Sequence, residues 1–181
     1  YFMSSGSEAV ETAVKLARKW AYRVKGVPSP EAEIIVFSGN FHGRTTTIVG
    51  FSTDPDSTSR FGPFTPGFRI VEYGSVAAVE AAITPETAAI FVEPIQGEGG
   101  YVIPPLGFLK ALREVADQHG ILLVADEVQS GVGRTGKMWA CDWEGVEPDI
   151  LVSAKGLGSG MPIGAFIAKE SVMTWEAGAH G

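Results

Sequence analysis

The sequence is poor in cysteine and histidine, with one cysteine and three histidines among 181 residues. Cys141 cannot form a disulfide within the chain, so a reducing compartment, the cytoplasm, is expected. The histidines, His42, His119 and His180, are scattered along the sequence. With a single cysteine they make a poor set of metal ligands, and no metal site is predicted.

Long apolar runs and an excess of positive charge are also missing. No stretch approaches the roughly 18 apolar residues that a membrane-spanning helix needs, so no membrane association is expected. The formal net charge of −7 argues against nucleic acid as a partner. Dinucleotide-binding, phosphate-loop, nucleophile-elbow and zinc-protease motifs are absent from the sequence. At 45% hydrophobic and 19% charged residues, the chain is typical of a globular interior.

Helix-like and strand-like stretches alternate along the chain. Apolar residues recur at helical spacing in residues 7–24, 75–83 and 106–119. Strands are predicted at residues 33–37 and 69–72, and apolar runs typical of buried strands occupy residues 87–92, 121–126 and 149–154; a further apolar stretch covers 163–168. A turn at 39–43 precedes a short helix, and the Pro- and Gly-rich residues 51–68 are predicted to form a long loop. This alternation predicts an α/β fold with a mostly parallel central sheet flanked by helices on both faces.

Two of the strand-like runs end on reactive groups. Lys155 follows residues 149–154, and Asp126 ends residues 121–126. Ligands of parallel sheets bind beyond the carboxyl ends of the strands, where both groups would lie. Burial would favour the neutral amine of Lys155, which can attack an aldehyde. A buried Asp126 needs a partner, which a protonated pyridine ring, a helix terminus or an arginine such as Arg134 would supply. Such an amine and carboxylate are what pyridoxal-phosphate chemistry requires.

Two glycine-containing segments are candidates for lining a site. Ser5, Gly6 and Ser7 open the first predicted helix, where free amides suit a phosphate, although a serine cap explains the same residues. Glu93 and Glu98 lie in a glycine-rich loop after a predicted strand. They can line a pocket and pair with a cation, or they can serve only solubility.

Aromatic and polar side chains near two predicted strand ends can likewise be interpreted either as ligand-binding or as purely structural. Phe41 could stack on a planar ring and Arg44 could bind a carboxylate, but a packed phenylalanine and a solvated arginine fit equally well. His42, between them, offers no catalytic evidence by itself. After Asp126, Val128 could pack on a ring face and Gln129 could donate to a ring oxygen.

Taken together, these segments resemble the class III aminotransferases, pyridoxal-phosphate enzymes of fold type I. The matching segments follow the order of the family and cover essentially the whole chain: Ser4–Ala9, Phe41–Thr45, Glu93–Gly100, Asp126–Gly131, Gly133–Gly136 and Ser153–Gly156. The resemblance implies the fold of the large domain, pyridoxal 5'-phosphate as cofactor, and a homodimer with its sites between subunits. It also implies a small-molecule amino donor and a 2-oxo acid as substrates.

The resemblance implies how the cofactor is held. The amides of Gly6 and Ser7 would bind its phosphate. Phe41 would stack on one face of the ring and Val128 would pack on the other. Gln129 would contact the ring hydroxyl.

The resemblance also implies the reacting groups. Lys155 would be the Schiff-base lysine and proton carrier, and Asp126 would pair with the pyridine nitrogen. Arg44 would receive the substrate carboxylate. Glu98 would be a gating acid that pairs with an arginine of a C-terminal domain.

The implied activity is transfer of an ω-amino group, with an ornithine-type donor favoured. Residues 51–55 and 61–68 look most like ornithine aminotransferases, whereas 155–164 look more like 4-aminobutyrate or acetylornithine aminotransferases. Related sequences include racemases and mutases. Residues 1–181 are expected to be the core of the cofactor-binding large domain, without the N-terminal segment and C-terminal small domain. A catalytically incomplete fragment that binds cofactor or a subunit is the alternative from another class.

Overall fold

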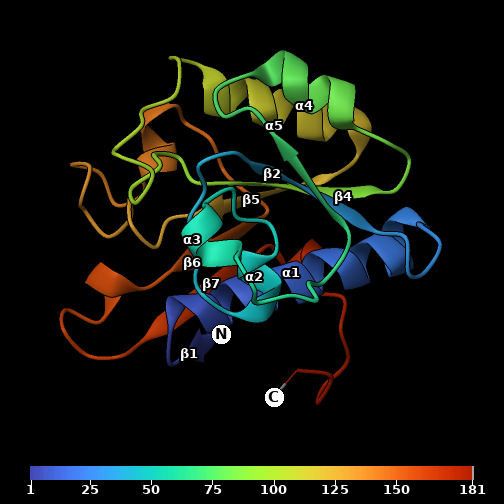
Figure 1. Ribbon diagram of the computed structural model, residues 1–181, viewed down its shortest axis with the longest axis horizontal. Coiled ribbons are helices and arrows are strands. Elements are labelled where there is room, and N and C mark those ends of the chain that lie inside the picture. Colours follow the sequence, from blue (N-terminus) through green and yellow to red (C-terminus); the bar gives the residue numbers. More distant parts are fainter. Residues whose placement is uncertain (181) are drawn as a thin grey trace.

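The computed structural model describes residues 1–180 and has the expected α/β architecture (Figure 1). Within these 180 residues, seven strands form one sheet in the order β1-β7-β6-β5-β4-β2-β3. Their bounds are β1 Phe2–Met3, β2 Glu33–Phe37, β3 Phe68–Val71, β4 Thr87–Val92, β5 Leu122–Asp126, β6 Ile150–Ser153 and β7 Gly164–Ala168. Strands β2 to β6 pair in parallel with one another, and β7 and β1 extend the sheet beyond β6 in antiparallel pairing. The predicted mostly parallel sheet is therefore confirmed.

Helices cover both faces of this sheet (Figure 1). The helices are α1 Gly6–Trp20, α2 Thr46–Val49, α3 Pro55–Thr58, α4 Val76–Ala82 and α5 Phe108–His119. Helix α1 packs against β6 and β7 on one face, while α4 and α5 lie over the other. Within residues 1–180, no helix combines the length and apolar character needed to cross a bilayer.

The two faces of the sheet bury alternate side chains of its central strands. In β2, Ile34 and Val36 belong to the core beneath α1, whereas Ile35 and Phe37 belong to the core beneath α4 and α5. A strand buried on both faces has no polar side, which is why these runs are continuously apolar. Each such side chain contributes about 1.5–3 kcal/mol relative to an exposed one.

The structure departs from the sequence-based elements in three places. The predicted loop at 51–68 contains α3, which Asp54 caps and Pro55 begins. The predicted helix at 7–24 ends its α-helical part at Trp20 and continues as a π-helical turn to Lys25. Strand β1 was not predicted, because two residues are too few to show a period of two.

Candidate active site

The strand order brings the carboxyl ends of β4, β5 and β6 together at one edge of the sheet. A pocket of about 330 Å³ opens there. Its lining includes eight of the nine predicted site residues: Gly6, Ser7, Phe41, Glu98, Asp126, Val128, Gln129 and Lys155. The ninth, Arg44, lies outside it. The structure therefore brings the predicted amine and carboxylate into one cavity, at the place where parallel sheets bind ligands.

Lys155 enters this pocket from a strained backbone position. It follows β6 directly and has a φ of 44°, in the left-handed region that costs a non-glycine residue about 1–2 kcal/mol. Its Nζ donates a hydrogen bond to Oε1 of Gln129 and lies 4.0 Å from Oε1 of Glu98. The amine is thus aimed at the polar groups of the pocket, but Lys155 is exposed, so the burial that was expected to favour its neutral form is absent.

Asp126 ends β5 and is buried. Its Oδ1 accepts a hydrogen bond from the amide of Val128 at 3.0 Å, and its Oδ2 lies 2.6 Å from Nδ1 of His42. Because a carboxylate can only accept, the imidazole carries its proton on Nδ1 and donates it. The buried acid therefore has His42 as its partner within residues 1–180, and not Arg134.

Burial and charge shift the pKa values of two neighbouring groups. Burial lowers the pKa of His42, but the hydrogen bond to Asp126 and the charges of Asp126 and Glu93 raise it, and the net direction is upward. Burial also raises the pKa of Glu93 to about 7; the Asp126 charge adds to this shift and His42 opposes it. Oε2 of Glu93 accepts the amide of Phe41 at 3.0 Å. The pocket thus holds a cluster of three buried titratable groups.

Sequence reasoning gave His42 no role and Glu93 none beyond shaping the pocket. His42 is 84 residues from its partner, so neither spacing nor a local motif reveals the pair. The strand order supplies the missing signal. The segments that carry His42 and Glu93 follow β2 and β4, and β4 lies between β2 and β5 in the sheet. Polar residues after three adjacent parallel strands meet at the same edge.

The start of α1 contributes backbone donors to the pocket. The side chain of Ser5 accepts the amide of Glu8 at 3.2 Å, and the carbonyl of Ser5 accepts the amide of Ala9 at 3.2 Å. The serine cap is therefore present. The amides of Gly6 and Ser7 donate to no acceptor within the described residues, and both residues line the pocket. Free amides at the start of a helix suit a phosphate.

The pocket also offers apolar surface and little spare room. Phe41 and Val128, from separate loops, both line it. A Cβ on Gly6 would lie 3.2 Å from Val128, and a Cβ on Gly97 would lie 2.4 Å from Cγ of Gln129. These glycines let the lining residues approach closely. An amine, a carboxylate, two free amides and an aromatic ring around about 330 Å³ fit a planar aldehyde that carries a phosphate.

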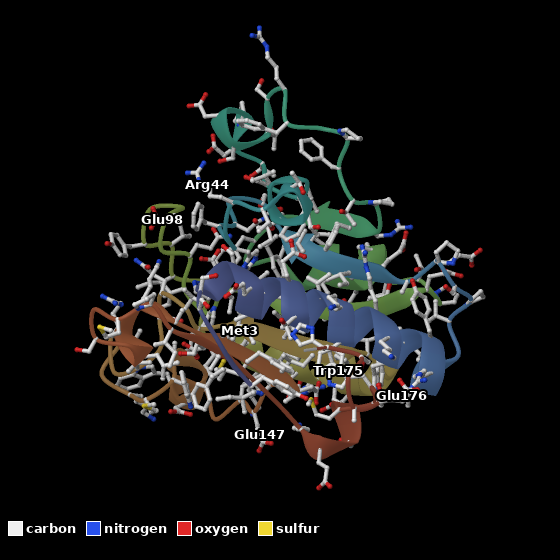
Figure 2. All side chains as sticks on the ribbon, turned by 90° about the horizontal axis from the view of Figure 1, so that it is seen from below. Met3, Arg44, Glu98, Glu147, Trp175 and Glu176 are labelled. Atoms are coloured by element: carbon white, nitrogen blue, oxygen red, sulfur yellow. The ribbon has the colours of Figure 1, made fainter. Side chains whose placement is uncertain are left out.

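Arg44 lines a second hollow of about 360 Å³ next to this pocket. Phe41 and Glu98 line both cavities. The guanidinium carbon of Arg44 lies 5.2 Å from the centre of the Phe41 ring. Figure 2 shows the labelled Arg44 and Glu98 projecting at the same edge of the molecule. Arg44 is therefore beside the pocket of Lys155, on the far side of Phe41.

Comparison with known proteins yields a family and two groups of relatives. The sequence profile of the family described as Aminotransferase class-III matches residues 1–181. Ornithine aminotransferases of Oceanobacillus iheyensis and Brevibacillus brevis are each 55% identical over 181 residues, covering 99% of this chain and 46% and 45% of their own lengths. The chain therefore spans about half the length of the curated relatives it matches.

Two solved structures resemble the fold closely. An ornithine aminotransferase from Toxoplasma gondii, crystallised with oxidised glutathione and with partial occupancy of pyridoxal phosphate, has a TM-score of 0.98 and 46% identity; 99% of this chain and 43% of that chain are covered. An acetylornithine aminotransferase from Elizabethkingia anophelis has a TM-score of 0.83 and 51% identity, covering 99% and 44%.

Proposed function

Because this chain belongs to the class-III aminotransferase family, of fold type I, we propose that the protein containing it transfers an ω-amino group to a 2-oxo acid. Pyridoxal 5'-phosphate is the proposed cofactor, and ornithine is the favoured donor. The observation that carries this proposal is the pocket shared by Lys155 and Asp126. The ornithine aminotransferases at 55% identity support the choice of donor.

Five residues would hold the cofactor without taking part in proton transfer. The free amides of Gly6 and Ser7 would bind the phosphate, helped by the positive end of the α1 dipole. Phe41 and Val128 would pack on the two faces of the ring and exclude water from it. Gln129 would contact the ring hydroxyl.

Pyridoxal phosphate, when bound, supplies an aldehyde and an aromatic ring that takes up electrons. Lys155 would provide Nζ as the amine for that aldehyde and would then hold and move a proton at the same atom. Gln129 accepts from Nζ and so orients it. Asp126 would hold a proton on the ring nitrogen, and His42 keeps its carboxylate oriented in the apolar site.

The substrate side of the site is assigned to Arg44 and Glu98. A guanidinium binds a carboxylate through two parallel hydrogen bonds, so Arg44 would receive the carboxylate of the donor or the 2-oxo acid. Glu98 lines both cavities and would act as a gate by pairing with an arginine elsewhere in the protein.

A second donor class has its own support. Residues 155–164 look more like 4-aminobutyrate or acetylornithine aminotransferases, and the acetylornithine enzyme of known structure is 51% identical. The two readings differ only in the donor, because the amine, the carboxylate and the phosphate site are common to both.

The assembly and location are also proposals. Tyr101, Ile103 and Leu106 are apolar and largely exposed, Leu106 by 98%. An exposed apolar patch is typical of a surface that another protein covers, and this supports a homodimer. The single, buried Cys141 supports a reducing compartment such as the cytoplasm. Alone, residues 1–181 would be an incomplete fragment that binds cofactor or a partner subunit.

An amino-donor panel on the full-length protein tests the proposed function. Purified protein is loaded with pyridoxal phosphate and offered ornithine, acetylornithine or 4-aminobutyrate with 2-oxoglutarate. We expect glutamate to form fastest from ornithine, and Lys155→Ala to abolish turnover. Equal turnover in Lys155→Ala, or no amino transfer from any donor, would contradict the proposal.

A further inference from the structure

Arg44 is held by a chain of hydrogen bonds that begins in the predicted loop at 51–68. Its Nη1 donates to Oγ of Ser57 at 3.0 Å, and Oγ of Ser57 lies 2.6 Å from Oδ2 of Asp54. A guanidinium can only donate and a carboxylate can only accept. The hydroxyl of Ser57 must therefore accept from Arg44 and donate to Asp54, so the direction of the chain is fixed.

Helix α3 places Asp54 and Ser57 where they can form this chain of hydrogen bonds. Asp54 caps it by accepting the amide of Asp56 at 3.1 Å through Oδ1, which leaves Oδ2 for Ser57. Ser57 is buried, so its hydroxyl has few competing partners. The hydrogen bond from Ser57 lowers the pKa of Asp54, and the amide of Asp56 and the charge of Arg44 act in the same direction. The acid thus stays charged near neutral pH.

An exposed arginine gains little from a fixed position unless that position is used. Ordering an arginine side chain costs about 2 kcal/mol of conformational entropy. When hydrogen bonds already hold the side chain in the free protein, ligand binding no longer has to meet this cost. The tethered guanidinium lies against the Phe41 ring and lines the hollow that adjoins the pocket of Lys155. That is where the far end of a donor would lie if its ω-amino group reached Lys155.

We propose that Asp54 and Ser57 are positioning residues that fix Arg44 for a donor carboxylate and thereby set the preference for donors that carry one. This inference rests on the proposed function, and it adds residues to which no motif assigns a role. Asp54 and Ser57 line the hollow beside Arg44 but not the pocket of Lys155, and their proposed effect on the donor runs through the position of Arg44.

The test compares two donors that differ by one carboxylate, ornithine and 1,4-diaminobutane. Full-length holoenzyme is mixed with each donor without a 2-oxo acid, and the cofactor absorbance change of the single half-reaction is followed. This isolates the donor from the carboxylates of the acceptor. The half-saturating concentration and the maximal rate are then measured separately.

In Ser57→Ala and Asp54→Asn, we expect the half-saturating concentration of ornithine to rise about fivefold to tenfold, the effect of one lost hydrogen bond. The maximal rate with ornithine and both constants for 1,4-diaminobutane should stay within about twofold. Asp56→Asn is the matched control, since its exposed carboxylate makes no hydrogen bond within residues 1–180. In an Arg44→Ala background, Ser57→Ala should add nothing.

Three results would overturn the inference: equal losses for both donors, no loss for either, or a full effect of Ser57→Ala without Arg44. In each of them the unmodified enzyme still reacts with ornithine, so the proposed function survives. If the unmodified holoenzyme reacts with no amine, the proposed function fails and this inference fails with it.

Discussion

Glu93 places a second buried carboxyl beside Asp126. Its pKa is raised from an ordinary value of 4.5 to about 7, first by burial and then by the negative charge of Asp126. Because the pKa is higher in the folded state, folding takes up a proton between pH 4.5 and about pH 7. The stability that the neutral form provides is complete below pH 4.5 and is lost as the pH rises through 7.

Glu93→Gln should therefore stabilise the protein in a pH-dependent way. The amide keeps an acceptor for the Phe41 N–H but carries no charge. We expect the free energy of unfolding to rise by about 1–3 kcal/mol at pH 8, and the gain to vanish towards pH 4.5. Urea unfolding across this range measures it. Glu98→Gln, in the same loop but exposed, is the control. A gain that does not depend on pH would show that charge is not the cause.

At the scale of elements, β7 and α1 meet where Gly164 allows it. A Cβ at Gly164 would lie 2.2 Å from the carbonyl oxygen of Ser5 and 3.2 Å from the amide nitrogen of Gly6. The first strand residue of β7 therefore fixes where α1 begins. The position of the phosphate donors depends on this contact.

Gly164→Ala should move these donors and weaken cofactor binding. We expect the dissociation constant of pyridoxal phosphate to rise on the order of tenfold, and that of pyridoxal, which has no phosphate, to change less. Absorbance titration of the full-length apoprotein measures both. Gly62→Ala is the control, because a Cβ there has no neighbour closer than 3.6 Å. Equal losses for both ligands would place the damage elsewhere.

Asp149 directly precedes β6, at the end of the strand opposite the pocket, and joins three elements there. It accepts hydrogen bonds from Arg113 of α5 at 2.7 Å, from the amide of Leu123 in β5 at 2.8 Å and from Lys169, just after β7, at 3.0 Å. Burial raises the pKa of Asp149, but these three donors outweigh it, and the net direction is downward. Its stabilising effect is present above the ordinary pKa of 3.8 and is lost as the pH falls through the lower folded value.

Asp149→Asn should lower the free energy of unfolding by about 2–4 kcal/mol at pH 7, because Arg113 and Lys169 lose the charge they share. The loss should shrink below pH 4. Denaturant unfolding of the full-length protein at the two pH values tests it. Glu147→Gln removes an 84% exposed carboxylate 3.8 Å from Lys169 and should cost little. A loss that is the same at both pH values would contradict the charge argument.

The elements that sequence could predict are those with a continuous or periodic apolar pattern. Strands β4 and β5 are buried on both faces, so their runs are unmistakable. The short helix α3 was hidden because its signal, Asp54 followed by Pro55, is equally typical of a turn. The direction of β7 was not predicted either, since an apolar run does not say which way the strand is paired.

The site residues also divide into those that the sequence pattern reveals and those that only the fold reveals. Lys155 and Asp126 could be placed because each directly ends an apolar strand, and the sheet then brings them together. His42 and Ser57 could not, because the hydrogen bonds that reveal them join segments that only the fold brings together. The roles given to the nine predicted residues stay predictions.

At the scale of the whole molecule, two features indicate that residues 1–181 act together with further protein. These are the exposed apolar patch and the partial coverage of the relatives. Residues 1–181 span about half of those proteins, and Tyr101, Ile103 and Leu106 are left uncovered. We expect this chain, expressed alone, to turn over ornithine about a hundredfold or more slowly than the full-length protein, because Glu98 lacks its proposed arginine partner. Parallel assays of both proteins check this. Comparable turnover would mean that residues 1–181 contain every group the reaction needs.

The assignment of the lysine is the claim on which the mechanism depends. Full-length protein is incubated with pyridoxal phosphate, reduced with borohydride to make the attachment permanent, digested and analysed by mass spectrometry. We expect the added mass on the peptide that contains Lys155, and on no other. Attachment to a different lysine, or an unchanged level of attachment in Lys155→Ala, would contradict the account.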